Sequence, residues 1–189
     1  LGQSLSVHPD KKYQRRDKGP GVGEIGTLIR SLGISDSDRA ELGWQFFQGL
    51  AFNRAAYCTD AHIKNYSVML DGPRVGLAPL YDLNTVPYLD ERLRFGPNGQ
   101  PPLAAMSVGG EYRFGSMTEA GFAVEARRLG VDPDRGVNEV RRLRRGLLGA
   151  FELARDQLIS IDDETAAFGR AAIDRLATIP TLTAAPTGR

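Results

Sequence analysis

The sequence predicts a mainly helical α+β domain, and three observations support this prediction. Apolar residues recur at helical spacing over residues 35–57 and again over most of the chain after residue 116. Two short strand-like runs, residues 66–70 and 74–77, are joined by Asp71-Gly72, a turn signal typical of a β-hairpin. The chain has 189 residues, of which 41% are hydrophobic and 25% charged, which suits one globular domain with its own core.

Two helices are expected before the hairpin. The glycine-rich run at residues 19–23 opens a helix without a preceding strand. Residues 35–38 then supply N-cap candidates for a helix that continues to Tyr57, with Leu42, Phe46 and Leu50 on one face. This second helix would lead directly into the segment that carries the most informative motif.

Three helices are expected after the hairpin. Residues 116–119 show the capping-box pattern and start a helix that ends near Gly130. A long helix follows Pro133, and a last one spans residues 163–179 before Pro180. The apolar residues that we expect on the buried faces of these last two helices are Val140, Leu143, Leu147, Phe151, Ala154, Leu158, Phe168, Ala172 and Leu176.

Two stretches show no helical pattern. Residues 86–115 are rich in glycine and proline, so we expect a long loop there. Loops of that length are usually functional or mobile. Residues 181–189 are small, polar and proline-containing, so we expect a disordered tail. The predicted organisation is therefore one domain at 1–180 followed by a tail at 181–189.

The motif before the hairpin combines oxygen-bearing side chains at a specific spacing. Asp60 and Asn65 stand five residues apart, which matches the D-x-x-x-x-N spacing of a kinase catalytic loop, and Asp82 follows 17 residues later. A hairpin brings its two ends together, so Asn65 and Asp82 should converge. Mg²⁺ prefers oxygen ligands and keeps several waters, so one carboxylate and one amide suffice as its protein ligands. Asp60 would then be left to orient an acceptor hydroxyl.

The stretches around this motif resemble a known family. They read Gln3-Ser4-Leu5, then Lys12-Tyr13 with Gly19-Pro20-Gly21, then Thr59 to Ser67 with Leu77 to Leu83, and finally Leu103-Ala104-Ala105-Met106 with Gly109-Gly110-Glu111. Together they resemble the C-terminal half of the HipA family, bacterial serine/threonine kinases that are the toxins of toxin–antitoxin pairs. The resemblance runs from about residue 3 to 130. The rest of the chain is similar to the family only in its expected helical character.

The resemblance implies a fold and a set of roles. The fold would be a protein-kinase-like C-terminal lobe, with Asp60 as the catalytic aspartate and Asn65 and Asp82 as ligands of the Mg²⁺ that accompanies ATP. His62 and Lys64 belong to the loop signature and would organise the loop or contact phosphate. The family's targets are aminoacyl-tRNA synthetases. The implied partner is a helix-turn-helix antitoxin of the HipB type, and DNA would be contacted only through that antitoxin.

One feature of a kinase is missing from the sequence. A kinase also needs an N-terminal lobe with a loop that covers the phosphates and a lysine that pairs with them. This chain has no strand-rich N-terminal portion, and its run at residues 19–23 lacks the Gly-Lys-Ser/Thr ending of a P-loop. We therefore expect the chain to be the C-terminal lobe of a longer kinase, with the N-terminal lobe absent, and to be inactive alone.

Two other functions stay open. Small-molecule kinases of the aminoglycoside or choline type share a D-x-H-x-x-N loop, which Asp60, His62 and Asn65 also satisfy. Those enzymes usually carry a histidine where this chain has Cys58 and a tryptophan-like residue where it has Leu83, and both differences favour the protein kinase. The third possibility is a non-catalytic module that binds an antitoxin.

Charge and cysteine content exclude several other classes. The net charge of +1 favours neither nucleic acid nor an acidic membrane, and no apolar run approaches the roughly 18 residues of a membrane span. No signal peptide is visible, and a single cysteine suits a reducing compartment, so we expect a cytoplasmic protein. We interpret that cysteine, Cys58, as a small buried residue that braces the loop rather than as a nucleophile beside His62.

Overall fold

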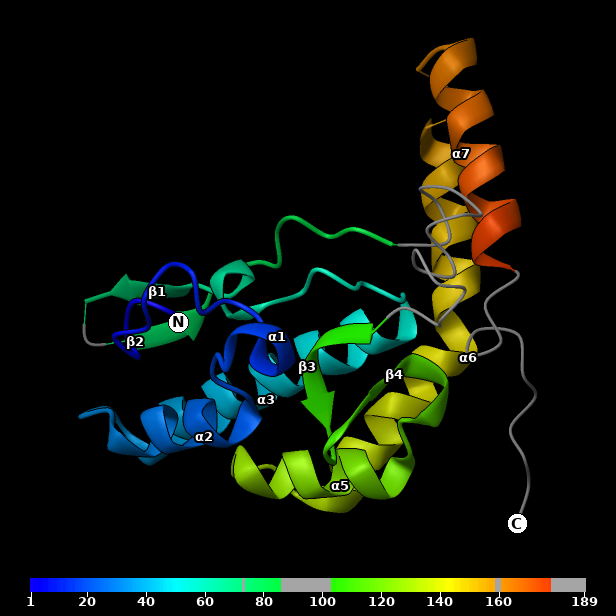
Figure 1. Cartoon of the computed structure of the whole chain (residues 1–189). Helices are drawn as coiled ribbons and strands as arrows, with labels where there is room; N and C mark the ends of the chain where they lie inside the picture. Colours follow the sequence, from blue (N-terminus) through cyan, green and yellow to red (C-terminus); the bar gives the residue numbers. More distant parts are fainter. Residues whose placement is uncertain (73, 86–102, 159–160, 178–189) are drawn as a thin grey trace.

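A computed structural model describes residues 1–72, 74–85, 103–158 and 161–177 of the chain (Figure 1). Helices dominate, and two separate two-stranded antiparallel sheets accompany them. The prediction of a mainly helical α+β domain is confirmed. The single hairpin expected from the sequence is joined by a second one.

The N-terminal half contains α1 (Gln14–Asp17), α2 (Val22–Ser31) and α3 (Asp36–Ala55). The Ser35 hydroxyl accepts a hydrogen bond from the backbone N–H of Asp38 at 3.0 Å, so α3 has the N-cap that the sequence predicts. Helix α3 is central and packs against α2, α5, α6 and one strand. The residues Ala51, Asn53 and Ala55 near its C-terminus are buried.

The predicted hairpin consists of β1 (Val68–Asp71) and β2 (Arg74–Leu77) and follows the short 3-10 helix η1 (Ile63–Asn65). Val68 pairs with Leu77 and Asp71 with Arg74. Gly72 has a φ of +56°, the left-handed conformation that a tight turn requires. The Gln45 side chain of α3 accepts a hydrogen bond from Leu77 N–H at 2.8 Å and thereby fixes β2 to the helix.

A second hairpin, formed by β3 (Leu103–Val108) and β4 (Glu111–Arg113), corrects the expectation of one long loop over residues 86–115. Gly109 and Gly110 connect its strands with φ values of +60° and +85°, as a type I′ turn requires. That Gly-Gly pair was the available signal in the sequence. Residues 86–102 lie outside the described residues.

The C-terminal part contains η2 (Phe114–Ser116), α5 (Glu119–Arg128), α6 (Pro133–Leu158) and α7 (Asp163–Leu176). The N-cap of α5 is Thr118, which accepts from Gly121 N–H, and not Ser116 as the capping-box pattern suggested. Helix α6 begins at the predicted Pro133. No helix within the described ranges combines the length and apolar content needed to cross a membrane.

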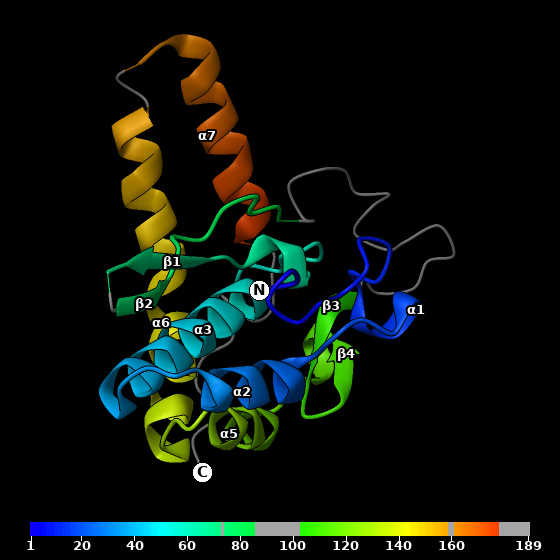
Figure 2. The ribbon, with the colours of Figure 1, turned by 90° about the vertical axis from the view of Figure 1, so that its left-hand side faces the viewer.

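Helices α6 and α7 form an antiparallel pair that projects from the rest of the fold in both views (Figures 1 and 2). Because α7 packs mainly on α6, only a narrow stripe of its surface is covered. The buried residues of that stripe are Ala166, Gly169, Ile173 and Leu176. Phe168 is 51% exposed and Ala154 is exposed, so their predicted burial is wrong. Residues 178–179 of the predicted last helix and the predicted tail at 181–189 lie outside the described residues.

Two apolar clusters form the core. The larger joins α2, α3, α5 and β3, and its largest buried side chains include Phe46, Phe47, Tyr66 and Phe122. The smaller joins the C-terminus of α3 to α6 and α7 and includes Cys58 and Ala61. The segment that carries the predicted catalytic loop therefore rests on both clusters.

Candidate functional site

The predicted catalytic loop begins where α3 ends. The backbone N–H of Cys58 reaches back to the Asn53 carbonyl at 2.8 Å, which closes the last turn. Between them Tyr57 adopts a φ of +60°, the left-handed conformation that reverses the chain direction. Its ring stacks on Phe114 with the ring centroids 4.3 Å apart. This stacking contact helps to hold a backbone conformation that is costly for a residue other than glycine.

The chain returns beside this loop after the hairpin. Cys58 and Thr85 form an isolated antiparallel bridge, and the Thr85 hydroxyl donates to the Ala56 carbonyl at 2.6 Å. Cys58 is only 4% exposed, and burial raises the pKa of its thiol to about 12. The thiol is therefore protonated at neutral pH, which supports the interpretation of Cys58 as a bracing residue.

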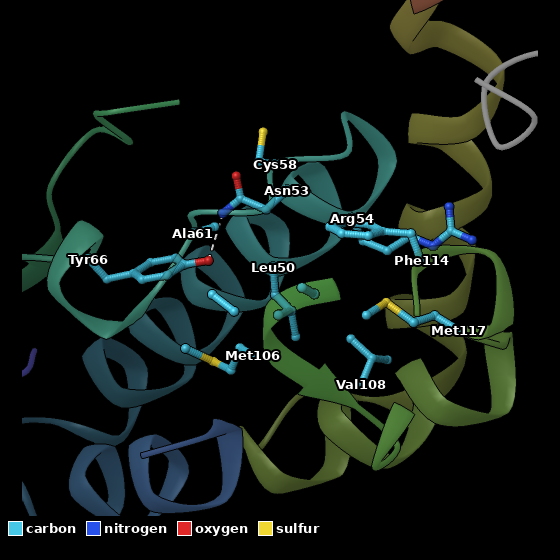
Figure 3. Close-up of a pocket in the computed structure, with 12 residues that line it drawn as sticks. Leu50, Asn53, Arg54, Cys58, Ala61, Tyr66, Met106, Val108, Phe114 and Met117 are labelled. Carbon is cyan, nitrogen blue, oxygen red and sulfur yellow. Dashed lines mark hydrogen bonds between the residues drawn. The ribbon is translucent and has the colours of Figure 1, made fainter. Parts of the chain in front are cut away.

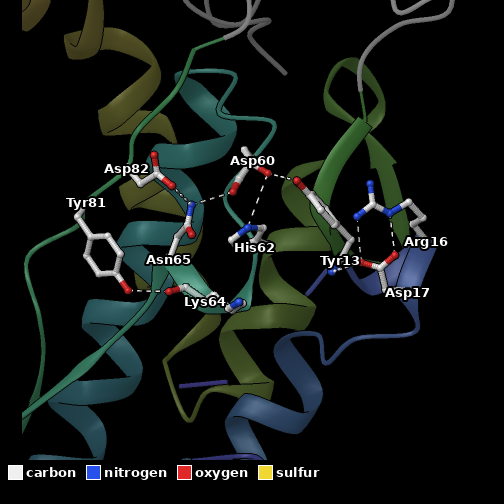
Figure 4. A network of polar contacts seen from close by, with 9 residues as sticks. All are labelled: Tyr13, Arg16, Asp17, Asp60, His62, Lys64, Asn65, Tyr81 and Asp82. Carbon is white, nitrogen blue, oxygen red and sulfur yellow. Dashed lines mark hydrogen bonds and ion pairs between the residues drawn. The ribbon is translucent and has the colours of Figure 1, made fainter. Parts of the chain in front are cut away.

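Asn65 lies between the two predicted aspartates (Figure 4). Its amide nitrogen donates to the backbone carbonyl of Asp60 at 2.9 Å and approaches Oδ2 of Asp82 at 3.4 Å. Asn65 is buried, whereas Asp82 is exposed and has a φ of +55°. The predicted convergence of Asn65 and Asp82 is therefore confirmed, and the same amide also fixes the loop around Asp60.

The donor set at this position fits magnesium. Asp82 presents an exposed carboxylate, an oxygen donor of the kind that Mg²⁺ prefers. The amide nitrogen of Asn65 faces this carboxylate, so Asn65 would turn its amide oxygen toward a bound ion. The described residues contain no group of three or more His, Cys, Asp and Glu side chains arranged to hold a metal. Asn65 and Asp82 are therefore the residues that would hold a magnesium ion at this position.

Asp60 stands at the mouth of the loop with its side chain 36% exposed. Its Oδ1 accepts a hydrogen bond from the Tyr13 hydroxyl and lies 3.8 Å from Nε2 of His62 (Figure 4). A carboxylate that is partly exposed and held by a donor can contact a substrate hydroxyl, which a buried one could not do.

His62 lies behind Asp60 with only 6% of its side chain exposed. Burial lowers the pKa of His62 below its ordinary 6.5, and the nearby Asp60 carboxylate only partly opposes this effect. The imidazole is thus mainly neutral at pH 7, so its 3.8 Å approach to Asp60 is not a permanent ion pair. Its ring packs edge-on against Tyr13 with the centroids 5.1 Å apart, which makes it part of the support behind the carboxylate.

Lys64 takes part through its backbone. Its carbonyl accepts a hydrogen bond from the Tyr81 hydroxyl at 2.6 Å, and that hydroxyl also lies 2.8 Å from the Ser67 hydroxyl. These contacts tie η1 to the segment that leads to Asp82. The Lys64 side chain is exposed and lies near the other predicted residues in Figure 4.

The contact between Tyr13 and Asp60 was not predicted from the sequence. The sequence indicated only that the Lys12-Tyr13 stretch resembles a family segment, and no spacing rule relates a tyrosine to an aspartate 47 residues later. The contact arises because α1 packs on β3, which places the N-terminal segment beside the loop.

A small internal cavity lies beneath the loop (Figure 3). Asn53 donates to the Tyr66 hydroxyl at 2.7 Å at its edge, and its remaining lining is mostly apolar. The volume of about 20 Å³ accommodates roughly one water molecule and is far below the several hundred Å³ of a ligand site. This cavity therefore belongs to the packing under the loop, and the open surface around Asp60 and Asp82 is the candidate site.

The comparisons with known proteins concern the family and the fold of the chain. The family model described as the HipA-like C-terminal domain matches residues 1–148. A Sinorhizobium fredii protein named "Putative kinase Y4mE" is 30% identical over 141 residues, which cover 74% of this chain and 30% of that protein. A chain in the solved complex of Shewanella oneidensis HipA, HipB and operator DNA aligns with a TM-score of 0.69 and 22% identity. That alignment covers 93% of this chain and 41% of the Shewanella chain, so this chain spans less than half the length of both relatives.

Proposed function

Because this chain belongs to the family of HipA-like C-terminal domains, we propose that it carries the catalytic residues of a serine/threonine protein kinase. The observation that supports this proposal best is the meeting of Asp60, Asn65 and Asp82 within the matched residues. The name of the Sinorhizobium relative, which includes the word kinase, supports it further. The full-length protein would transfer the γ-phosphate of ATP to a serine or threonine hydroxyl.

The proposed mechanism depends on positioning and charge, since phosphoryl transfer needs little covalent chemistry from the protein. Asp60 would orient the acceptor hydroxyl and take up its proton. Asn65 and Asp82 would hold the magnesium, which neutralises charge on the phosphates when it is bound with ATP. Buried, mainly neutral His62 would support the Asp60 carboxylate from behind, and exposed Lys64 would face the phosphates.

The partners are proposed by likeness. The Shewanella structure holds HipA together with HipB and operator DNA. We propose that the protein is likewise a growth-arrest toxin that binds a helix-turn-helix antitoxin of the HipB type and meets DNA only through it. The proposed protein substrate is an aminoacyl-tRNA synthetase, which implies action in the cytoplasm.

A second candidate, a small-molecule kinase, is less well supported. Its signature places a histidine two residues before the aspartate. Here that position is Cys58, which is buried and bonded through its backbone to both Asn53 and Thr85. A third candidate, a non-catalytic module that binds an antitoxin, is motivated by the share of 30% to 41% of its relatives that the chain spans. A wild-type protein that transfers no phosphate would distinguish this candidate from the two kinases.

The proposal is tested by phosphate transfer from radiolabelled ATP with magnesium, measured in the full-length protein with a synthetase and with free aminoglycosides and choline as acceptors. We expect labelling of the protein acceptor and its loss, by about 10²-fold or more, in Asp60→Asn and Asp82→Asn. Asp71→Asn, at the exposed end of β1, makes the same change away from the site and should retain activity.

The outcomes separate the candidates. Labelling of the small molecules alone would favour the second one. An inactive wild-type protein that still binds its antitoxin would favour the third. Full activity of folded Asp60→Asn, with folding verified by circular dichroism, would refute the assigned role of that residue.

A further inference from the structure

The contact between Tyr13 and Asp60 holds the carboxylate that we propose to be catalytic. The phenolic hydroxyl donates to Oδ1 of the carboxylate (Figure 4). Oδ2 of the same carboxylate has no hydrogen-bond partner in the part of the chain that the structure describes. One oxygen is thus held by the protein, and the other is left for an incoming group.

The backbone holds Tyr13 rigidly. Its N–H donates to Oδ2 of Asp17 at 3.1 Å, and its carbonyl accepts from the N–H groups of Asp17 at 3.1 Å and Gly19 at 3.0 Å. A Cβ at Gly19 would lie 2.4 Å from the Lys11 carbonyl oxygen, so this turn requires glycine to pack as closely as it does. Tyr13 therefore enters the site on a fixed support and not on a free loop.

The ring of Tyr13 is also held on its sides. The edge-on contact with His62 has the ring centroids 5.1 Å apart, and the Arg16 guanidinium lies 4.1 Å from the Tyr13 ring centroid. Burial and then the contact with Asp60 raise the pKa of Tyr13 to about 12. The hydroxyl consequently keeps its proton and remains a donor throughout the neutral range.

We propose that Tyr13 is a positioning residue, whose hydroxyl fixes one oxygen of Asp60 so that the other faces the acceptor hydroxyl. This inference rests on the proposed kinase function. A carboxylate without a hydrogen-bond donor can rotate about its Cβ–Cγ bond, and each unproductive orientation lowers the fraction of reactive complexes. A donor on Oδ1 removes that freedom before substrate binds, which is the preorganisation that catalysis by positioning requires.

The test is Tyr13→Phe in the full-length protein, which keeps the ring and removes the hydroxyl. We expect kcat to fall about 10- to 100-fold, which is the effect of losing one hydrogen bond to a charged group. The KM for ATP should stay unchanged, because Tyr13 contacts the proposed acceptor side of the site.

Tyr112→Phe is the matched control, since Tyr112 lies on β4 near Arg15 and outside the site. It should retain wild-type kinetics. A double-mutant cycle of Tyr13→Phe and Asp60→Asn, followed by thermal unfolding, measures the coupling energy between the two side chains and needs no enzymatic assay. We expect the two substitutions to be non-additive.

The outcomes distinguish this inference from the proposed function. Wild-type kcat in Tyr13→Phe would overturn the inference alone, as would a rise in kcat, which would mean that Tyr13 blocks the acceptor position. Additive effects on unfolding would show that the contact is not formed and would also overturn it. A wild-type protein without transfer to any acceptor would overturn the proposed function and, with it, this inference.

Discussion

Replacing Asn65 with aspartate tests the arrangement around Asp82 in the domain itself, without any enzymatic assay. The substitution keeps the shape of the side chain and exchanges its NH₂ group for a second carboxylate oxygen. That oxygen would stand 3.4 Å from Oδ2 of Asp82 and 2.9 Å from the backbone carbonyl of Asp60. Two attractive contacts thus become repulsive ones.

The size of the effect follows from these distances. Two unit charges 3.4 Å apart repel by about 1 kcal/mol in water and about 5 kcal/mol at an effective dielectric constant of 20. Since Asp82 is exposed, the lower end of this range applies. Loss of the hydrogen bond to the Asp60 carbonyl adds about 1 kcal/mol or more, because that carbonyl loses its partner. The free energy of unfolding should therefore fall by about 2–4 kcal/mol, or Tm by about 5–15 °C in a domain of this size.

The assay is thermal unfolding followed by circular dichroism, with and without millimolar MgCl₂. If the site holds magnesium, the ion should restore more stability to Asn65→Asp than to the wild type, because two carboxylates then share one cation. Asn138→Asp, at an exposed position of α6, is the matched control and should change Tm little. An unchanged Tm in Asn65→Asp would refute the contacts, and an equal magnesium response in both proteins would refute the metal site.

Three further predictions concern the support of the site. Gly43→Ala should lower the free energy of unfolding by about 3 kcal/mol, because its Cβ would lie 2.2 Å from the Leu129 carbonyl oxygen. Gly146→Ala, with nothing within 4 Å, should instead stabilise α6 by up to about 1 kcal/mol, and urea unfolding compares the two. Cys58 should react slowly with a thiol reagent at pH 8 and rapidly after denaturation, because burial raises the pKa of its thiol to about 12; rapid labelling of the native protein would contradict this. His62 has a pKa below 6.5 in the folded state, so the unfolded state binds its proton more readily and stability is lost as the pH falls through 6.5. His62→Gln should lose less stability than the wild type between pH 7 and 5, and parallel pH curves would argue against a buried neutral imidazole.

Much of the fold was predictable from short-range signals. Ser35 marks the start of α3, Pro133 opens α6 and Asp71-Gly72 forms the first hairpin turn, because capping, proline geometry and turn chemistry depend on a few neighbouring residues. The second hairpin was missed although Gly109-Gly110 carries the same kind of signal. Its strand β3 is rich in alanine and lacks clear alternation, so the pattern on either side of the turn did not suggest strands.

Burial was predicted less well than secondary structure. The apolar spacing of the last helix suggested that Phe168 is covered, yet that residue is exposed and Gly169 takes the contact with α6. A helix has one covered face only where something packs on it, and periodicity does not tell how wide the partner is. The projecting pair of α6 and α7 leaves most of α7 in solvent.

By itself the sequence determined the spacing of Asp60, Asn65 and Asp82, the hairpin that brings the last two together, and the family to which the chain belongs. These features depend on residue identity and local geometry, which a linear pattern records. Only the tertiary structure decided that Tyr13 meets Asp60, that His62 is buried and mainly neutral, and that Lys64 contacts the site through its backbone. Such properties come from packing between segments far apart in the chain, since burial and contact distance arise only when the core has formed.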